Sequence, residues 1–380
     1  MTAGEAKIIA VPDTIPFEYR NNKIIVKGKI NQEEYDFVVD TGAPTVIWEE
    51  VAQELQLVKT NASITSNDAN GTKQKLDFYK SETVEMGALK VEGMNVSALS
   101  TLSEELKCYA NGGIIGGNFL IHYNWQIDYE NKRLIACSNL SNLSISPDAI
   151  KINAIISQPQ GKIVISDISL LGIKEEFALD TGNGGYLNLG MEIWNQNKIE
   201  EKVKRVDAYG YSNLSVGGRK LITTNTIQTN LTTPMGTIKD AVINVDTKNS
   251  LIGNAYLSQF GLITIDYTSK DGAVYFPRKK VTSADNMSFG FIPVFKKETN
   301  SFVVGKIYKF SDAEKSGLKL DDTILAINGK DFDNLTYANY CSNISVGKPS
   351  FIMEGKTVVI SVLRGGKKLD FEFDKYPLFK

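Results

Sequence analysis

The chain has 380 residues, of which 23% are charged and 42% are apolar, a composition typical of a globular protein with many turns. Its length corresponds to two or three domains of ordinary size. The formal net charge of −2 provides no basic excess for neutralising phosphates, so we expect no nucleic-acid partner.

The sequence has no apolar run that approaches the roughly eighteen residues of a membrane-spanning helix, and we expect no such segment. The N-terminal residues do not show a basic start followed by an apolar stretch. The compartment therefore stays open. On the assumption that a signal segment was removed, we favour a periplasmic or other extracytoplasmic location.

Histidine and cysteine usage excludes several chemistries. The single histidine, His122, lies in the apolar segment NFLIHYNWQIDY without a nucleophile signature, so we interpret it as structural. The same scarcity argues against a histidine-based zinc site, and we expect no metal or other cofactor. The three cysteines, Cys108, Cys137 and Cys341, exclude a disulfide scaffold and allow one bridge.

The first predicted elements form a β-hairpin. Residues 23–29 and 33–39 alternate or run β-branched around Asn31-Gln32, and the second strand leads directly into Asp40-Thr41-Gly42. Helix-forming residues with apolar spacing then predict one short helix over residues 49–57.

The same order of elements returns later in the chain. Residues 162–170 and 175–179 predict a second hairpin around Leu171-Gly172, and this hairpin leads into Asp180-Thr181-Gly182. A second short helix is predicted over residues 191–203.

These two stretches belong to a longer internal repeat. Each Asp-Thr-Gly is followed at a distance by two apolar residues and Gly, and then by Ile-Asp-Tyr. The offsets are 140 positions from Asp40 to Asp180, 137 from Gly116 to Gly253, and 138 from Ile127 to Ile265. Because so few gaps separate the copies, we infer two copies of one fold.

From about Ser283 the pattern changes, and no third Asp-Thr-Gly follows. Short strand patterns surround a helix start, and a further helix is predicted near residues 337–341. We therefore predict three domains, at residues 1–150, 151–282 and 283–380. The predicted fold class is mainly β, with two duplicated β-rich lobes followed by a domain of short strands and one or two helices.

The duplication gives the Asp-Thr-Gly segments a chemical meaning. Peptide hydrolysis without a metal or covalent intermediate needs one group that deprotonates water and another that protonates the substrate. Two carboxylates that share one proton do both, and such a pair titrates as a unit. We predict Asp40 and Asp180 as the catalytic pair, one from each lobe.

The neighbouring residues are predicted to support this pair. Gly42 and Gly182 would let the two backbones approach closely across the lobe interface. The hydroxyls of Thr41 and Thr181 would hydrogen-bond across it and hold both carboxylates coplanar.

DTGA at Asp40, DTGN at Asp180, and the IIGG and LIGN segments resemble the pepsin and retropepsin superfamily of aspartic peptidases, over about residues 15–280. The resemblance implies two β-rich lobes with an active-site cleft between them, and an apolar-apolar-Gly segment packed behind each catalytic loop. A compact bacterial, retropepsin-like version fits best.

Two features depart from the family pattern. Asn183 follows the second Asp-Thr-Gly, where family members usually carry Ser, Thr or Ala. Residues 66–75 contain no tyrosine, although the substrate-covering flap hairpin should lie there. Tyr209-Gly210-Tyr211 occupies the corresponding place in the second lobe, where it fits either a flap or a plain aromatic strand pair.

The C-terminal segment resembles the PDZ domains of bacterial peptidases, on the run DAEKSGLKLDDTILAINGKDF over residues 312–332. By this resemblance, Phe289, Gly290 and Phe291 lie in a loop whose N–H groups bind a peptide's terminal carboxylate, and the peptide then adds to the sheet edge. The alternative is that this domain only packs against the lobes.

The sequence thus predicts a monomeric aspartic endopeptidase that binds a polypeptide in the cleft between its lobes. The rival hypothesis is a non-catalytic peptide-binding adaptor built on a degenerate form of the same fold. The separation of the two carboxylates distinguishes them, because an adaptor has no need to hold Asp40 and Asp180 within hydrogen-bonding distance.

Overall fold

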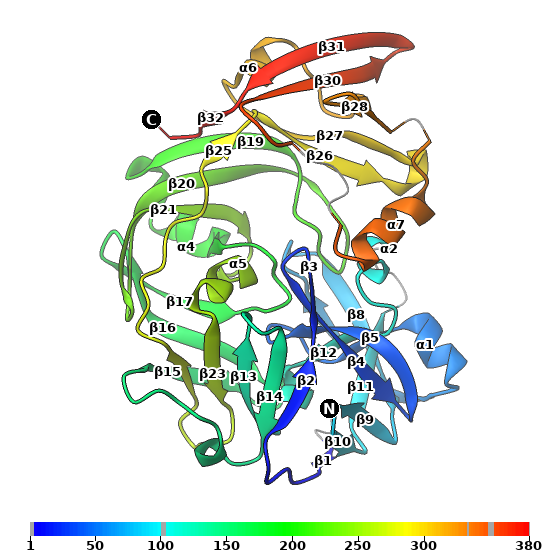
Figure 1. Ribbon diagram of the computed structural model, residues 1–380, viewed down its shortest axis with the longest axis vertical. Helices are drawn as coiled ribbons and strands as arrows, with labels where there is room; N and C mark the ends of the chain where they lie inside the picture. The colour runs from blue at the N-terminus through cyan, green and yellow to red at the C-terminus, as the bar shows by residue number, and fades with distance from the viewer. Residues whose placement is uncertain (1–3, 100–103, 333, 349–352, 380) are drawn as a thin grey trace.

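The computed structural model describes residues 4–99, 104–332, 334–348 and 353–379. It is mainly β, as predicted, with short helices at the ends of strands (Figure 1). The N-terminal strands lie at the opposite end of the molecule from the C-terminal strands β30 (Thr357–Arg364) and β31 (Lys367–Asp374).

The first sheet is built from residues 5–116. In spatial order its strands are β1 (Glu5–Ala6), β10 (Leu89–Glu92), β9 (Thr83–Met86), β4 (Lys23–Ile30), β5 (Glu33–Asp40), β12 (Gly113–Gly116), β6 (Val46–Trp48), β11 (Asn95–Leu99), β8 (Lys73–Lys80) and β7 (Val58–Asn67), with β3 (Glu18–Arg20) against β4. The helices of this part are α1 (Glu49–Glu54), α2 (Glu104–Lys107) and α3 (Gly117–Leu120).

The predicted first hairpin is confirmed as β4 and β5. Asn31 and Gln32 form its turn with φ of 48° and 74°, the left-handed conformation that a two-residue hairpin turn requires. The predicted helix begins at Glu49 but ends at Glu54, three residues earlier than residue 57. Its apolar residues Val51 and Ala52 are buried.

Six strands connect the two halves of the repeat. In spatial order they are β2 (Asp13–Pro16), β14 (Arg133–Cys137), β13 (Asn124–Asp128), β23 (Leu262–Asp266), β24 (Ala273–Phe276) and β15 (Ile150–Ser157). The strands β13 and β23 carry the two Ile-Asp-Tyr landmarks and pair with each other antiparallel, with Trp125 opposite Ile265. Equivalent segments of the repeat therefore meet in one ladder.

The second half forms a matching set of strands. They are β16 (Lys162–Leu170), β17 (Ile173–Leu179), β22 (Leu251–Ile252), β18 (Leu187–Gly190), β21 (Gly236–Thr247), β20 (Leu221–Thr233) and β19 (Lys204–Tyr211), with the helices α4 (Met191–Gln196) and α5 (Asn254–Leu257). The predicted hairpin around Leu171-Gly172 is confirmed as β16 and β17.

The C-terminal segment adds further strands to this sheet. They are β26 (Phe291–Lys296), β27 (Ser301–Tyr308), β28 (Thr323–Ile327), β29 (Lys330–Asp331), β30 and β31, with a separate pair of β25 (Met287–Ser288) and β32 (Tyr376–Pro377). Its helices are α6 (Asp312–Lys315) and α7 (Tyr337–Ser345), and α7 covers the helix predicted near residues 337–341.

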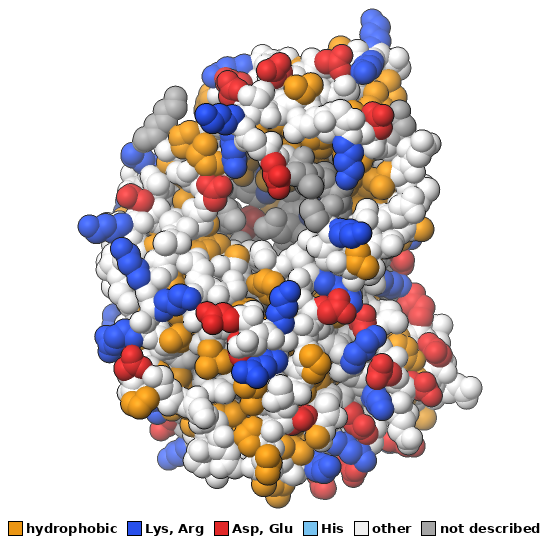
Figure 2. Space-filling model, in the orientation of Figure 1, with side chains coloured by type: hydrophobic (Ala, Val, Ile, Leu, Met, Phe, Trp, Pro, Cys, Tyr) orange, Lys and Arg blue, Asp and Glu red, His pale blue; other side chains and the backbone are white. Residues whose placement is uncertain are grey.

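Charges of both signs are distributed over the surface. On the face shown in Figure 2, Lys and Arg side chains are interspersed with Asp and Glu side chains. Among the residues that the structure describes, no helix is long and apolar enough to cross a membrane.

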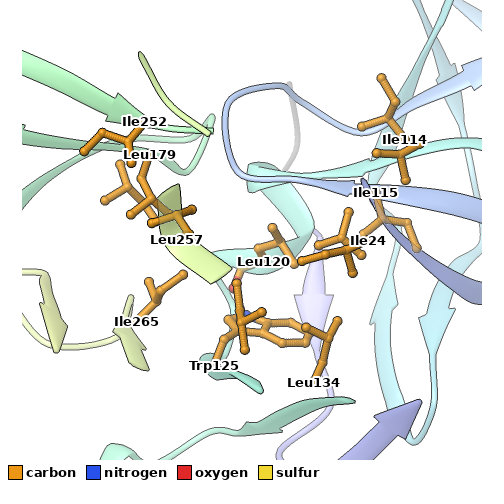
Figure 3. Close-up of a cluster of buried hydrophobic side chains, with 14 of the residues drawn as sticks. Ile24, Ile114, Ile115, Leu120, Trp125, Leu134, Leu179, Ile252, Leu257 and Ile265 are labelled. Atoms are coloured by element: carbon orange, nitrogen blue, oxygen red, sulfur yellow. The ribbon is translucent and has the colours of Figure 1, made fainter. Parts of the chain in front are cut away.

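Buried apolar side chains form two clusters. One runs from Ile9 to Val281, and the other runs from Phe289 to Phe373 and includes Cys108. Figure 3 shows side chains from both repeat copies packed within the first cluster, among them Ile115 and Ile252. Because such packing is dense, truncating one of these side chains to Ala should cost about 2–5 kcal/mol.

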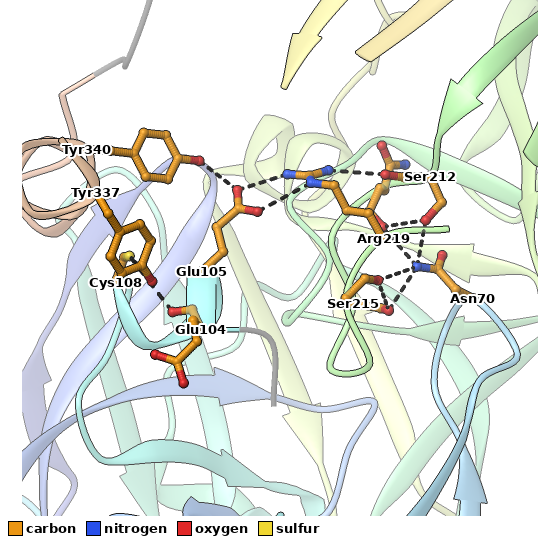
Figure 4. Close-up of polar contacts among 11 residues, drawn as sticks. Asn70, Glu104, Glu105, Cys108, Ser212, Ser215, Arg219, Tyr337 and Tyr340 are labelled. Atoms are coloured by element: carbon orange, nitrogen blue, oxygen red, sulfur yellow. Dashed lines mark hydrogen bonds and ion pairs between the residues drawn. The ribbon is translucent and has the colours of Figure 1, made fainter. Parts of the chain in front are cut away.

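A covalent and polar connection joins the C-terminal segment to the first sheet (Figure 4). A disulfide links Cys108, next to α2, to Cys341 on α7, across 233 positions of sequence. Beside it, Glu105 accepts a hydrogen bond of 2.6 Å from the Tyr340 hydroxyl and forms an ion pair of 2.9 Å with Arg219. The single bridge that the sequence allowed therefore fastens α7 to α2, and Cys137 is free and buried.

Reduction of this bridge should destabilise the protein. A cross-link that closes a long loop restricts the unfolded chain, and its loss typically costs about 2–4 kcal/mol. We expect Cys341→Ala, or reductant added to the wild type, to lower the unfolding midpoint to a similar extent. Reductant added to the Cys341→Ala variant is the control and should have no further effect, whereas an insensitive wild type would contradict the bridge.

Candidate active site

Asp40 is the last residue of β5, where the strand leaves the first sheet. The N–H of Gly42 donates a hydrogen bond of 2.7 Å to its Oδ1. The strand is anchored by Val38 and Val39, which are buried in the apolar core. The buried strand thus fixes the backbone, and the turn after it directs the carboxylate toward the second half of the repeat.

Asp180 follows β17 in the same way. Its N–H donates 2.9 Å to the carbonyl of Ile252, and its Oδ1 accepts a hydrogen bond of 3.0 Å from the N–H of Asn183. Both candidate carboxylates therefore accept a backbone N–H from the turn that follows them.

The structure brings the two turns into direct contact. A Cβ placed on Gly42 would lie 2.9 Å from Cγ of Asp180, and one placed on Gly182 would lie 2.1 Å from Oδ2 of Asp40. Each carboxyl group therefore lies against the glycine of the opposite turn. Any side chain at Gly182 would collide with the opposite carboxylate, so the glycines are needed for close approach.

The two threonines join the turns reciprocally. The N–H of Thr41 donates 3.1 Å to the hydroxyl of Thr181, and the N–H of Thr181 donates 3.1 Å to the hydroxyl of Thr41. Each hydroxyl also donates a hydrogen bond across the interface. The Thr41 hydroxyl donates to the carbonyl of Leu179 at 2.6 Å, and the Thr181 hydroxyl donates to the carbonyl of Val39 at 2.8 Å. Both side chains are fully buried, so each hydroxyl has its partners within the protein.

The apolar-apolar-Gly segments lie behind these turns. Ile115 and Gly116 pair in parallel with Val39 and Asp40, and Ile252 pairs with Leu179. A Cβ on Gly116 would lie 2.2 Å from the carbonyl oxygen of Ala43, and one on Gly253 would lie 2.3 Å from that of Gly185. The glycine of each landmark is thus explained by the close approach of the turn that follows Asp40 or Asp180.

Burial and proximity change the acidity of both carboxyl groups. Burial raises the pKa of Asp40, and the N–H of Gly42 opposes this effect. Burial, followed by the charge of Asp40, raises the pKa of Asp180 well above its ordinary value. Because two adjacent carboxylates cannot both ionise cheaply in a low-polarity site, the pair retains a proton at pH values where an exposed Asp has lost it.

The sequence did not reveal Lys23, which lies next to the pair. Its Nζ donates a hydrogen bond of 2.6 Å to the carbonyl of Gly182 and lies 5.6 Å from the centre of the Tyr109 ring. Burial lowers the pKa of Lys23, while the charges of Asp180 and Asp40 raise it. Only the hairpin that contains Lys23 could be predicted, because the contact depends on how the two halves pack.

Asn183 has a defined role in the second turn despite its departure from the family pattern. Its backbone N–H, rather than its side chain, bonds Asp180. Its Oδ1 accepts a hydrogen bond of 2.8 Å from the N–H of Gly185, and its Nδ2 donates one of 2.9 Å to Asn188. The side chain therefore braces the turn instead of contacting the carboxylate.

The two possible flap segments have different environments. Tyr209-Gly210-Tyr211 lies in β19, which pairs with β27, and the Tyr211 hydroxyl donates 2.8 Å to Asp321. The hairpin of β7 and β8 instead reaches the second half of the repeat. At its tip, the Asn70 amide donates to the hydroxyls of Ser212 and Ser215, both at 2.8 Å.

The predicted peptide-binding loop lies apart from the two aspartates. Phe289 and Phe291 are buried in the second apolar cluster, and Gly290 between them has a φ of +89°. The N–H of Gly290 donates a hydrogen bond of 3.0 Å to the hydroxyl of Ser288.

His122 lies in the turn after α3, where its ring faces that of Tyr123. Among the described residues, no group of three or more His, Cys, Asp or Glu side chains is placed to hold a metal ion.

Comparison with known proteins gave one family match. The family model described as aspartyl protease matches residues 26–119, a segment that contains Asp40 and Ile114-Ile115-Gly116 but ends before Asp180. No curated protein matches the chain significantly.

Several solved structures resemble the chain at low identity. An aspartic proteinase from Irpex lacteus is 13% identical, with 70% of this chain and 97% of that chain covered and a TM-score of 0.38. A retropepsin-like aspartic protease from Rickettsia conorii is 19% identical, with 36% and 96% covered and a TM-score of 0.25. Basic 7S globulin from soybean is 10% identical, with 72% and 98% covered and a TM-score of 0.36.

These structural likenesses are too low to support conclusions about the site. The family match is the informative comparison, because it includes the first Asp-Thr-Gly and the segment behind it. It supports the aspartic protease superfamily and a protease-like function.

Proposed function

We propose that the chain is an aspartic endopeptidase in which Asp40 and Asp180 form the catalytic pair. One observation carries the proposal: each of the two carboxyl groups lies beside the glycine of the opposite turn, so close together that the charge of Asp40 raises the pKa of Asp180. Thr41, Gly42, Thr181 and Gly182 support the pair through the reciprocal hydrogen bonds and close approach described above.

The proposed reaction uses the proton that the pair retains. The ionised carboxylate removes a proton from water as the water attacks the peptide carbonyl, while the protonated carboxyl group protonates the carbonyl oxygen. The carboxyl group that took the proton from water then donates it to the peptide nitrogen, and the C–N bond breaks. A hydroxyl proton of the tetrahedral intermediate returns to the other carboxylate, so the pair again holds one proton. Because the two groups titrate together, we assign the roles to the pair rather than to either residue.

The proposed architecture is two duplicated lobes, at residues 1–150 and 151–282, with the substrate in the cleft between them. The pairing of β13 with β23 supports the duplication, because equivalent segments meet there. So does the parallel pairing of β12 with β5 and of β22 with β17 behind the two turns.

Residues 283–380 are proposed to form a PDZ-like domain that recruits or positions a peptide. Within the described residues, β26 pairs with β27 on one side only, so its other edge is available for an added strand. Phe289, Gly290 and Phe291 lie in the loop that leads into β26. The helix α7 packs nearby through Tyr340, whose ring stacks on that of Phe295 with 4.1 Å between the ring centres.

The adaptor hypothesis is less well supported. An adaptor would bind peptides without two adjacent carboxyl groups, and burying two like charges together is unfavourable unless they serve a purpose. The contact between Asp40 and Asp180 therefore favours the enzyme.

Replacing either aspartate should abolish cleavage without disrupting the fold. We expect Asp40→Asn and Asp180→Asn each to lower the rate on an unstructured protein by at least about 10²–10⁴-fold, because each removes one proton-transfer group. The unfolding midpoint at neutral pH should not fall. Burial raises the pKa of both carboxyl groups, which costs stability above their ordinary pKa, and a neutral amide removes that cost. Undiminished cleavage by either variant would refute the proposal.

Lys23 should control the pH range of the activity. Its ammonium favours the ionised forms of both aspartates and so lowers their pKa values. Removing it in Lys23→Met should raise both, so both limbs of the bell-shaped pH–rate profile should move to higher pH, by about one unit. Lys27→Met is the matched control on the same strand, because Lys27 is exposed and pairs with Asp36 at 2.6 Å. A profile of Lys23→Met that coincides with that of Lys27→Met would contradict this assignment.

The PDZ-like domain should discriminate a free carboxylate at a peptide C-terminus. Backbone N–H groups in the loop at Gly290 would hydrogen-bond such a carboxylate but bind a neutral amide less well. We expect labelled peptides with a free C-terminus to bind the Asp40→Asn variant, which does not cleave them, at least about tenfold more tightly than the same peptides amidated. Equal binding of the two forms would exclude carboxylate recognition.

A further inference from the structure

The two halves of the repeat have the same strand order, so the hairpin of β7 and β8 has a counterpart in the hairpin of β19 and β20. The first half follows the order β5, β12, β6, β11, β8 and β7, and the second half follows the order β17, β22, β18, β21, β20 and β19. Each parallel or antiparallel pairing in one series has the same direction in the other. The tips of the two hairpins are therefore equivalent segments of the repeat.

Equivalent segments meet at two separate places near the carboxyl groups. The turns after Asp40 and Asp180 contact each other, and so do the two hairpin tips, residues 68–72 and 212–218, which we call the clasp. Because a contact between equivalent segments lies on the axis that relates the two copies, both contacts lie on one axis. A polypeptide that passes between the catalytic turns and the clasp is therefore surrounded by protein.

The helix α2 connects the clasp to the catalytic turns. Glu105 of α2 forms an ion pair of 2.9 Å with Arg219, which directly follows the clasp. Tyr109, just after α2, has its ring centre 5.6 Å from Nζ of Lys23, which bonds the turn after Asp180. The clasp and the catalytic turns therefore both lie beside α2.

The ladder of β13 and β23 lies on the other side of the catalytic turns. Asn254 of α5 donates a hydrogen bond of 2.6 Å to the carbonyl of Thr181. The same side chain accepts one of 2.7 Å from the hydroxyl of Tyr129, which follows β13. In Figure 1, β13 and β23 lie below α5, whereas β19 and α2 lie above it. The space between the turns and the clasp is thus on the side away from this ladder.

The clasp is held together by hydrogen bonds between polar groups. Figure 4 shows the Asn70 amide directed at hydroxyl groups of the opposite tip, including that of Ser215. Oδ2 of Asp68 accepts hydrogen bonds of 2.8 Å from the Ser215 hydroxyl and 2.9 Å from the N–H of Gly217. A Cβ on Gly217 would lie 3.1 Å from Cβ of Thr72, so the second tip lies directly against the first. Because water can replace such hydrogen bonds, the two tips can separate at low net cost.

The hairpin of β19 and β20, which we call the post, is held on its outer side. Its strand β19 pairs with β27 of the C-terminal segment over Ala208–Gly210. Beyond its tip, Arg219 contacts both carboxylate oxygens of Glu105, at 2.9 Å and 3.3 Å. The hydroxyl of Tyr340 on α7 holds Glu105 in turn, at 2.6 Å. The C-terminal segment therefore fixes the post at two places.

The hairpin of β7 and β8, which we call the arm, is much less supported. Among the residues that the structure describes, β7 is the last strand of its sheet and pairs with β8 alone. None of the ten residues of β7 is buried, and eight of them are exposed. A segment with so few buried contacts opens at a low free-energy cost. When the clasp breaks, the arm is therefore the hairpin that moves.

We propose that the chain encloses its substrate in a ring with a single gate: the arm moves away from the clasp to admit a polypeptide, while the C-terminal segment keeps the post in place. The proposal rests on the function proposed above and adds how the substrate enters. It gives the C-terminal segment a part in the entrance to the cleft that is independent of any peptide it binds. A polypeptide without free ends can reach the carboxyl groups only while the clasp is open.

A covalent lock across the clasp tests whether entry requires opening. In Thr72→Cys combined with Gly217→Cys, the two Cβ atoms start 3.1 Å apart, close to the roughly 3.5–4.5 Å of a disulfide. The substrates are one unstructured peptide in its linear form and the same peptide cyclised head to tail. We expect the oxidised double variant to cleave the cyclic peptide at least about 100-fold more slowly than the matched control does, because a ring cannot thread through a closed ring. The linear peptide, which can enter by its end, should lose less.

Thr72→Ser combined with Gly217→Ser is the matched control for the lock. It places side chains of similar size at the same two positions and cannot form a disulfide. A count of free thiols in the unfolded protein shows whether the lock has formed in the double cysteine variant. Cleavage of the cyclic peptide by the locked variant at the rate of this control would overturn the ring.

Hydrogen exchange tests the single gate without any cleavage. Asn70→Asp removes the amide donor of the clasp and adds a carboxylate beside Asp68, which bonds the same Ser215 hydroxyl. We expect amide exchange in the arm, residues 58–80, to become about tenfold faster, because the clasp is what holds its tip. Exchange in the post, residues 204–233, should stay within about twofold of the wild type, because its outer contacts remain.

Lys59→Met is the matched control on the arm itself. It removes the exposed ion pair of 2.6 Å between Lys59 and Asp77 and leaves the clasp intact, so exchange in the arm should change by less than about twofold. Equal acceleration of the arm and the post in Asn70→Asp, or equal acceleration of the arm in Lys59→Met, would overturn the single gate. If the wild type cleaves nothing, the peptidase proposal fails, whereas the exchange measurement still decides whether the gate exists.

Discussion

The reciprocal hydrogen bonds between Thr41 and Thr181 are the constraint on which the rest of the site depends. Each threonine uses its N–H and hydroxyl toward the opposite turn, so neither turn satisfies its buried polar groups alone. The resulting proximity requires glycine at positions 42 and 182, because a side chain at either would contact the opposite carboxylate. The two halves of the repeat thus complete one another at a single buried point.

This proximity has an electrostatic consequence. Two carboxyl groups held close together in a partly buried site favour a shared proton, and they also attract a compensating cation. Lys23 supplies this cation, although burial lowers the pKa of its ammonium group and so disfavours the charged form. Lys23 is positioned by the turn between β3 and β4, whose residues Asn21 and Asn22 both have left-handed φ values. Asn22 in turn donates a hydrogen bond of 3.1 Å to the carbonyl of Gly184, so the hairpin that contains Lys23 contacts the turn after Asp180.

The sequence was informative where local pattern and repetition determine structure. The two hairpins feeding Asp-Thr-Gly and the starts of the short helices follow from strand alternation, turn residues and helix propensity, and the repeat predicted which segments correspond. The duplication did not predict where the copies differ. The contact of Lys23 with the carbonyl of Gly182 and the pairing of Cys108 with Cys341 both depend on how distant segments of the chain pack together.

Asn183 shows for a single residue what the sequence cannot predict. Its departure from the family pattern is visible in the sequence, but its hydrogen-bond partners are not. In the structure the asparagine bonds Gly185 and Asn188 while its N–H still bonds Asp180. Gly210 in Tyr209-Gly210-Tyr211 is a similar case. A side chain there would collide with Gly305 and Lys306, which lie on a strand more than 90 positions away in the sequence.

The attachments of the C-terminal segment limit how the proposed peptide-binding domain can act. It contacts the first sheet through the disulfide at α7 and the second half through β19, and Tyr340, Glu105 and Arg219 connect all three parts. A flexibly tethered module raises the local concentration of its ligand without fixing its orientation. A module fastened at several points instead presents its ligand in one direction.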